Sequence, residues 1–193
     1  MFQSIQTLVH TNITANTSYE LVVTQGTSVI TRKFNIIVNP GTTTQAIPAG
    51  LEEGINYNAS DATKATLVLD APNKDFVYVA GSFNNWQPNA TYAMKKDPSS
   101  TKFWLELTGL TSGQTETYQY WIVKQSPIAN SPSLVKTADP YSTLVLSNYD
   151  DPYIPAASYP NMPVYPAGQE REVTVLQTGQ TPYNWSNATN TFV

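Results

Sequence analysis

Residues 77–86, with the sequence VYVAGSFNNW, contain the most informative pattern in this chain. Their apolar residues alternate as in a β-strand, Gly81 then permits a turn, and a polar loop of Ser and Asn residues follows. The loop ends on the indole of Trp86. A pyranose ring offers polarised C–H groups to the face of an aromatic ring, and its hydroxyls can bond to polar neighbours. The stretch therefore predicts a strand followed by a sugar-binding loop.

Composition narrows the classes of partner. Of the 193 residues only 12% are charged and the net charge is −4, so a basic, nucleic-acid-binding surface is not expected. Polarity comes mainly from Thr, Asn, Ser and Gln, which suits a neutral ligand and is also common in extracellular β-proteins. There is no cysteine, which excludes disulfides and thiol chemistry. No apolar run approaches the roughly 20 residues of a membrane span.

Short strand-like runs recur along the chain, and Gly, Pro, Asn and Asp separate them. This spacing predicts an all-β fold, an antiparallel sandwich of the immunoglobulin-like type. The predicted strands are residues 5–10, 19–24, 29–38, 65–69, 76–80, 102–107, 117–123, 142–146 and 172–177.

Three zones follow from this distribution. Residues 1–45 form a partial N-terminal β segment, either the remnant of an upstream domain or strands added to the next one. Residues 46–148 form the sandwich. Residues 149–193 are rich in Pro, Tyr and Asn, which keeps most of them out of a central strand. We expect them to form an extended tail across a domain surface, with the tyrosines packed down.

Alternation within the strands predicts which aromatic residues leave the core. Phe103 should point inward and Trp104 outward, and Tyr78 should point outward between two inward valines. For residues 118–123 two arrangements are open, and one of them turns Gln119 and Trp121 outward. If these strands are neighbours in one sheet, Tyr78, Trp104, Trp121 and Gln119 share an outer face. That face is either a set of sugar-stacking platforms or a surface covered by residues 1–45 or by the tail.

Residues 46–146 resemble carbohydrate-binding module family 48 and the glycogen-binding domain of the AMP-activated protein kinase β-subunit. The resemblance lies in residues 67–72, 77–86, 103–113, 118–122 and 138–141, in that order. It implies that Trp86 stacks on an α-glucan such as starch, glycogen or a maltooligosaccharide. At the position of a sugar-binding lysine this chain has Gln119. A second stacking tryptophan, expected shortly before Asp139, has no counterpart in residues 124–130.

The tail is similar to the region ahead of the catalytic barrel in bacterial α-amylase-like proteins of glycoside hydrolase family 13. The matching pieces are residues 137–142, 159–163, 175–178 and 182–185. The resemblance implies an extracellular or periplasmic polysaccharide-degrading parent enzyme whose catalytic domain is a partner of this chain. A signal peptide is not recognisable at the N-terminus.

Catalysis by this chain itself is not predicted. Glycoside hydrolysis uses two carboxylates that face each other across a cleft. The paired acids at 52/53, 150/151 and 170/172 lie in predicted turns or strand edges, and the single histidine is His10. No cofactor or metal is expected. The predicted function is non-catalytic binding of α-glucan through Trp86, Asn84, Asn85, Gln119, Trp104 and Trp121. The alternative is a structural accessory domain that packs on the catalytic barrel and binds no sugar.

Overall fold

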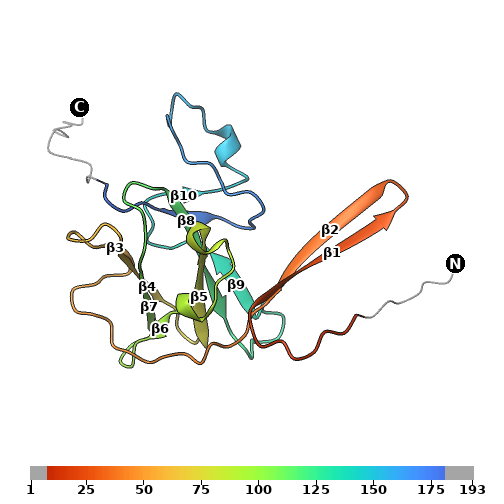
Figure 1. Ribbon diagram of the computed structural model, residues 1–193, viewed down its shortest axis with the longest axis horizontal. Helices are drawn as coiled ribbons and strands as arrows, with labels where there is room; N and C mark the ends of the chain where they lie inside the picture. Colours follow the sequence, from red (N-terminus) through yellow and green to blue (C-terminus); the bar gives the residue numbers. More distant parts are fainter. Residues whose placement is uncertain (1–7, 181–193) are drawn as a thin grey trace.

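The computed structural model describes residues 8–180 (Figure 1). In this part of the chain the regular structure consists of β-strands and three short 3-10 helices, η1 (Ser82–Asn84), η2 (Ala90–Tyr92) and η3 (Asp151–Tyr153). Neighbouring strands pair antiparallel. The predicted all-β antiparallel fold class is therefore confirmed. No helix within the described residues is long and apolar enough to cross a membrane.

Two sheets form the body of the molecule. One has the strand order β3-β4-β7-β6, with bounds Gly54–Tyr57, Ala65–Asp70, Lys102–Leu107 and Lys95–Lys96. The other has the order β10-β11-β8-β5, with bounds Val145–Leu146, Val173–Leu176, Glu116–Val123 and Phe76–Gly81. A further strand, β9 (Leu134–Thr137), pairs with the second half of β8.

The main core lies between the two sheets and follows the predicted alternation. Val77 and Val79 of β5 and Phe103, Leu105 and Leu107 of β7 are all buried in it. Strand β8 uses one of its two open arrangements, because Tyr118 and Tyr120 point into this core. Gln119 and Trp121 consequently lie on the outer side of the same strand.

Most predicted strands are present within one or two residues of their predicted bounds. There are two exceptions. Of the first predicted strand, residues 8–10 are not in a strand and residues 5–7 lie outside the described part. Of the predicted strand 142–146, only Val145–Leu146 forms a strand. Residues 182–185 of the tail resemblance also lie outside it. The pattern missed β3, β6 and β9, which have two to four residues each. Strands this short contain too few alternating positions to produce a signal, and β6 consists of two lysines.

The N-terminal strands β1 (Thr17–Gln25) and β2 (Ser28–Ile36) form a separate hairpin that projects from the sandwich (Figure 1). Paired residues share a face, so the register defines an apolar and a polar face. Tyr19/Phe34 and Val23/Ile30 lie on the apolar face, where the Tyr19 and Phe34 rings stack at 5.3 Å. Ser18/Asn35 and Glu20/Lys33 lie on the polar face. The apolar face remains largely exposed, with Val23, Ile30 and Phe34 each about half accessible.

The proline-rich tail makes an excursion between β10 and β11 and then returns to the second sheet (Figure 1). The prediction that its tyrosines pack down is wrong for two of them, because Tyr149 and Tyr153 are 81% and 82% exposed. Tyr165 does pack, and its hydroxyl donates to the Arg171 carbonyl at 2.6 Å. Because β11 belongs to the sheet, strands of the sandwich extend beyond residue 148, and the division of the chain into domains stays a prediction.

A buried carboxylate ties β8 to the chain that follows β9. Both Tyr118 and Tyr120 donate their hydroxyls to Asp139 Oδ2, at 2.7 and 2.8 Å. The other oxygen, Oδ1, accepts the Tyr141 backbone N–H at 2.8 Å. The Asp139 backbone N–H donates to Thr174 Oγ1 of β11 at 2.6 Å. Burial, together with the nearby carboxylate, raises the pKa of both tyrosines well above its ordinary value.

These raised pKa values predict alkaline unfolding. In the unfolded chain both phenols ionise near their ordinary pKa of about 10, whereas the folded state holds them neutral. Stability from the pair is therefore complete below about pH 10 and is lost as the pH rises above it. Urea unfolding at a series of pH values should show the midpoint falling above about pH 10, and Tyr118→Phe should reduce that fall. An unchanged pH dependence in Tyr118→Phe would contradict this assignment.

Candidate functional site

The loop predicted to bind sugar is built on hydrogen bonds of Asn84. Its Oδ1 accepts the Gly81 N–H at 2.9 Å, and its Nδ2 donates to the Val79 carbonyl at 2.9 Å. The side chain thus closes the turn between β5 and η1. Because both ends of the amide are occupied within the loop, Asn84 shapes the candidate site rather than offering free groups to a ligand.

Two consecutive residues of this loop adopt left-handed backbone conformations. Asn85 has φ of 52° and Trp86 has φ of 58°. This region is uncommon for residues other than glycine and is unusual for a bulky one. The Trp86 N–H donates to the Gly81 carbonyl at 2.9 Å, and the Gln87 N–H donates to the Asn84 carbonyl at 3.0 Å. Strain of this kind is retained where surrounding contacts enforce it, often at binding sites.

This backbone places the Trp86 indole on the outer side of the β5–β8 sheet. The half-buried ring packs against a cluster that includes Tyr78 and Trp121 and against another that includes Val173 and Val175. It also lines two adjacent cavities of about 480 Å³ and about 330 Å³. Both volumes fall in the range of about 300–1,000 Å³ that small-molecule sites occupy. Trp86 is therefore both anchored and accessible from two sides.

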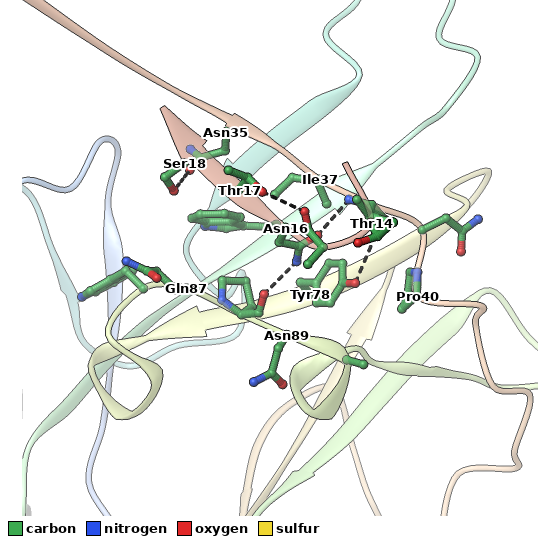
Figure 2. Close-up of a pocket in the computed structure, with 17 residues that line it drawn as sticks. Thr14, Asn16, Thr17, Ser18, Asn35, Ile37, Pro40, Tyr78, Gln87 and Asn89 are labelled. Carbon is green, nitrogen blue, oxygen red and sulfur yellow. Dashed lines mark hydrogen bonds between the residues drawn. The ribbon is translucent and has the colours of Figure 1, made fainter. Parts of the chain in front are cut away.

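The larger cavity has a neutral polar lining (Figure 2). Among the described residues that line it, none carries a charge. Ser18 and Asn35 lie on one side, and Gln87 and Asn89 lie on the other (Figure 2). Hydroxyl and amide groups both donate and accept hydrogen bonds, as sugar hydroxyls do. The cavity is thus chemically suited to an uncharged, hydroxyl-rich ligand.

Asn16 joins the two sides of this cavity. Its Nδ2 donates to the Pro88 carbonyl at 2.7 Å, and its Oδ1 accepts the Val38 N–H at 2.8 Å. Tyr78 adds a further link by donating its hydroxyl to the Val38 carbonyl at 3.1 Å. Burial raises the pKa of Tyr78 above its ordinary value. The base of the hairpin is therefore held against the Trp86 loop.

The smaller cavity contains charged groups that are paired. Glu20 and Lys33 approach to 3.6 Å on the hairpin, and Lys136 and Glu170 approach to 3.5 Å on the sandwich side. The Lys136 ammonium also lies over the Trp121 ring, 4.6 Å from its centre, which is within cation–π range. Asn85 lines this cavity with an exposed side chain. Balanced charges leave donors and acceptors for hydroxyls without favouring an anion or a cation.

Lys136 was missed by sequence reasoning. It lies directly opposite Trp121, on the neighbouring strand β9. The alternation pattern of residues 118–123 does not predict this neighbour, because Lys136 is 15 residues away in the sequence and strand pairing brings it to Trp121. Alternation within residues 134–137 could have predicted strand β9, but four residues are too few to establish a period.

Gln119 does not line either of the Trp86 cavities. It is fully buried, and its Nε2 donates to the carbonyls of Glu170 and Glu172 at 2.7 and 2.9 Å. One of the two predicted arrangements of residues 118–123 turned Gln119 out of the core, and this is the arrangement found. The returning tail then covers the Gln119 side chain. The amide therefore anchors residues 170–172 to the sheet, and its predicted role as a sugar contact is not supported by this placement.

The other two predicted platforms are covered as well. Trp121 lines both Trp86 cavities but is only 3% exposed, so it offers little ring surface for stacking. Trp104 is 4% exposed and belongs to β7, in the opposite sheet. It therefore does not share a face with Tyr78 and Trp121, contrary to what the sequence had suggested. Its Nε1 donates to the Gln45 carbonyl at 2.8 Å, and Lys95 lies over its ring at 4.3 Å. For Trp104, the N-terminal segment therefore provides part of the cover, as one of the two alternatives predicted.

The described residues contain no group of three or more His, Asp or Glu side chains arranged to hold a metal ion. The two acids at 150 and 151 make different contacts. Asp150 Oδ2 accepts the Ser147 hydroxyl at 3.0 Å, while the Asp151 N–H donates to the Ser147 carbonyl. Glu53 forms an ion pair with Lys102 at 2.7 Å. These contacts assign the carboxylates of Asp150 and Glu53 to local structure. The Asp151 carboxylate differs, because its Oδ2 is buried without a hydrogen-bond partner among the described residues.

No protein-family model and no curated protein matches this sequence. Solved structures match part of it. A pullulanase mutant from Paenibacillus barengoltzii, complexed with maltotriose, matches 49% of the chain at 19% identity and a TM-score of 0.34. A Klebsiella pneumoniae pullulanase, also complexed with maltotriose, matches 51% at 18% identity and a TM-score of 0.39. The matched regions are 13% and 9% of those two chains. This chain thus corresponds to a small part of either protein's length.

Proposed function

We propose that this chain is a non-catalytic carbohydrate-binding module for α-glucans, part of an extracellular or periplasmic amylase-type glycoside hydrolase. One observation carries the proposal. Trp86, held in a left-handed backbone conformation, forms a wall shared by two cavities whose polar groups suit sugar hydroxyls. The resemblance of residues 77–86 to family 48 modules supports the choice of α-glucan as the ligand.

The strength of binding follows from the number of aromatic platforms. By analogy with nucleic-acid bases, stacking on one ring contributes about 1–3 kcal/mol. Trp86 is the one predicted tryptophan platform that the fold leaves accessible, because Trp104 and Trp121 are buried. Hydrogen bonds to Asn85, Gln87 and Lys136 would add smaller amounts. We therefore expect a dissociation constant of roughly millimolar to tens of micromolar.

Affinity electrophoresis in native gels with and without amylopectin tests this proposal. The wild-type chain should be retarded by amylopectin, and Trp86→Ala should lose most of that retardation because the stacking surface is gone. Tyr149→Ala serves as the matched control, since Tyr149 is an exposed aromatic far from the cavities in sequence and does not line them. Circular dichroism should show that both variants keep the β-fold.

Either of two results would count against the proposal. A wild-type chain that migrates unretarded does not bind this glucan. Retardation that survives Trp86→Ala places binding somewhere other than the Trp86 cavities.

A structural accessory role is the second candidate, and the exposed tyrosines of the tail favour it. Tyr149, Tyr153 and Val164 are each more than 80% exposed on the excursion between β10 and β11. Exposed aromatic and apolar groups on one segment are typical of surfaces that pack on another domain. In this role the excursion would contact the catalytic barrel of the parent enzyme. An unretarded wild type together with a folded chain would favour it.

A further inference from the structure

The two cavities at Trp86 adjoin and form one groove. Ser18, Asn35, Trp86, Gln87 and Trp121 line both of them. A third cavity, of about 620 Å³, shares Lys33, Asn35, Lys136 and Glu170 with the second. Asn35 lines all three. The groove therefore passes along the base of the hairpin, from a neutral end to an end lined by paired charges.

The groove has two walls that come from different parts of the chain. Trp86 and Trp121 belong to the sandwich side, whereas Ser18 and Asn35 are cross-strand partners in β1 and β2. The Ser18 hydroxyl donates to Asn35 Oδ1 at 2.6 Å. Within residues 8–180, the Asn35 side chain uses its Oδ1 in this contact and its Nδ2 donates to no other residue, which leaves that donor for a ligand.

The orientation of the hairpin is informative. A ribbon that served only to cover the sandwich would bury its apolar face, because burial of apolar area is the main favourable term in packing. Here the polar pairs Ser18/Asn35 and Glu20/Lys33 line the cavities. Leu21, Val23 and Ile30 of the opposite face remain about half exposed. The space between hairpin and sandwich is thus kept polar and open.

We propose that the polar face of the β1–β2 hairpin is the second wall of the glucan site, with Ser18 and Asn35 as ligand contacts opposite Trp86. The ligand is a linear, uncharged oligosaccharide of more than two sugar units, which runs along the hairpin base. This inference rests on the proposed function and adds to it the N-terminal wall and the requirement for chain length. Paired charges in the groove add hydrogen-bonding groups without selecting a charged ligand.

Isothermal titration calorimetry on the full chain tests the wall, with maltose, maltotriose and maltohexaose as probes. Wild-type affinity should rise from maltose to maltohexaose. The double variant Ser18→Ala/Asn35→Ala should bind maltohexaose about tenfold more weakly, as expected for the loss of one or two hydrogen bonds. Asn35→Trp should abolish binding by filling the groove. Thr31→Trp is the matched control, because Thr31 is on the same polar face but does not line the cavities.

The outcomes separate this inference from the function on which it rests. If Trp86→Ala abolishes binding while Asn35→Trp binds like the wild type, the hairpin wall is wrong and the proposed function stands. If the wild type binds none of the probes, the proposed function fails and the groove fails with it. Equal affinity for maltose and maltohexaose would overturn the requirement for chain length. Thermal unfolding checks that the hairpin variants are folded. Substitutions at Ser18, Thr31 and Asn35 should be tolerated, because all three side chains are at least partly accessible.

Discussion

Asp139→Ala is expected to lower the free energy of unfolding by about 3–5 kcal/mol, because it leaves several buried polar groups without partners. The carboxylate accepts the hydroxyls of Tyr118 and Tyr120, which are both fully buried. It also accepts the Tyr141 N–H. Alanine provides no acceptor, and Asp139 is only 2% exposed, so bulk water does not reach the site in the folded chain. Urea unfolding followed by circular dichroism measures the loss.

Two further variants show whether the hydrogen bonds cause this effect. Asp139→Asn preserves the shape and one acceptor, so it should cost less than Asp139→Ala. Tyr118→Phe removes one donor and its demand for an acceptor together, and should cost only about 1 kcal/mol. If Asp139→Ala lowered the free energy of unfolding by less than Tyr118→Phe does, the network would contribute little to stability.

Gly81→Ala is expected to destabilise the fold by about 1–3 kcal/mol and to abolish amylopectin retardation. A Cβ atom at this position would lie 2.6 Å from the Thr117 carbonyl oxygen and 2.7 Å from the Phe83 ring. The backbone of Gly81 is extended, with φ of −160°, so the cost is steric. Because the Gly81 carbonyl accepts the Trp86 N–H, movement at this residue displaces the indole.

Gly109→Ala is the matched control for this prediction. It places a Cβ where no atom lies within 4 Å, although its φ of +75° adds backbone strain. It should therefore cost stability and leave binding unchanged. The combination of thermal unfolding and affinity electrophoresis distinguishes the two glycines. A Gly81→Ala chain with wild-type retardation would contradict the role of this turn in positioning Trp86.

Local patterns predicted the strands and their inner faces because alternation is a property of neighbouring residues. The inward positions of Val77, Val79 and Phe103 follow from a period of two and needed no knowledge of strand pairing. The turn at Gly81 and the polar loop before Trp86 were equally visible in the chain. The short strands β6 and β9 were not, because two to four residues cannot establish a period.

The candidate site was predicted only in part. Trp86 and Asn85 lie at the cavities as expected, whereas Asn84 holds the loop and Gln119 holds the tail. Alternation shows that a side chain leaves the core, but it does not show what covers it afterwards. Residues far away in the sequence decide that, such as the carbonyls of 170–172 above Gln119.

By itself, the sequence determined the all-β class, the inward faces of the strands and the exposed turn that carries Trp86. The tertiary structure alone decided that Trp104 lies in the opposite sheet from Trp121, that Lys136 faces Trp121, and that the hairpin stands beside Trp86. The physical reason is the range of the interactions. Alternation and turn chemistry act over a few residues, whereas sheet order and the groove depend on contacts between segments far apart in the chain.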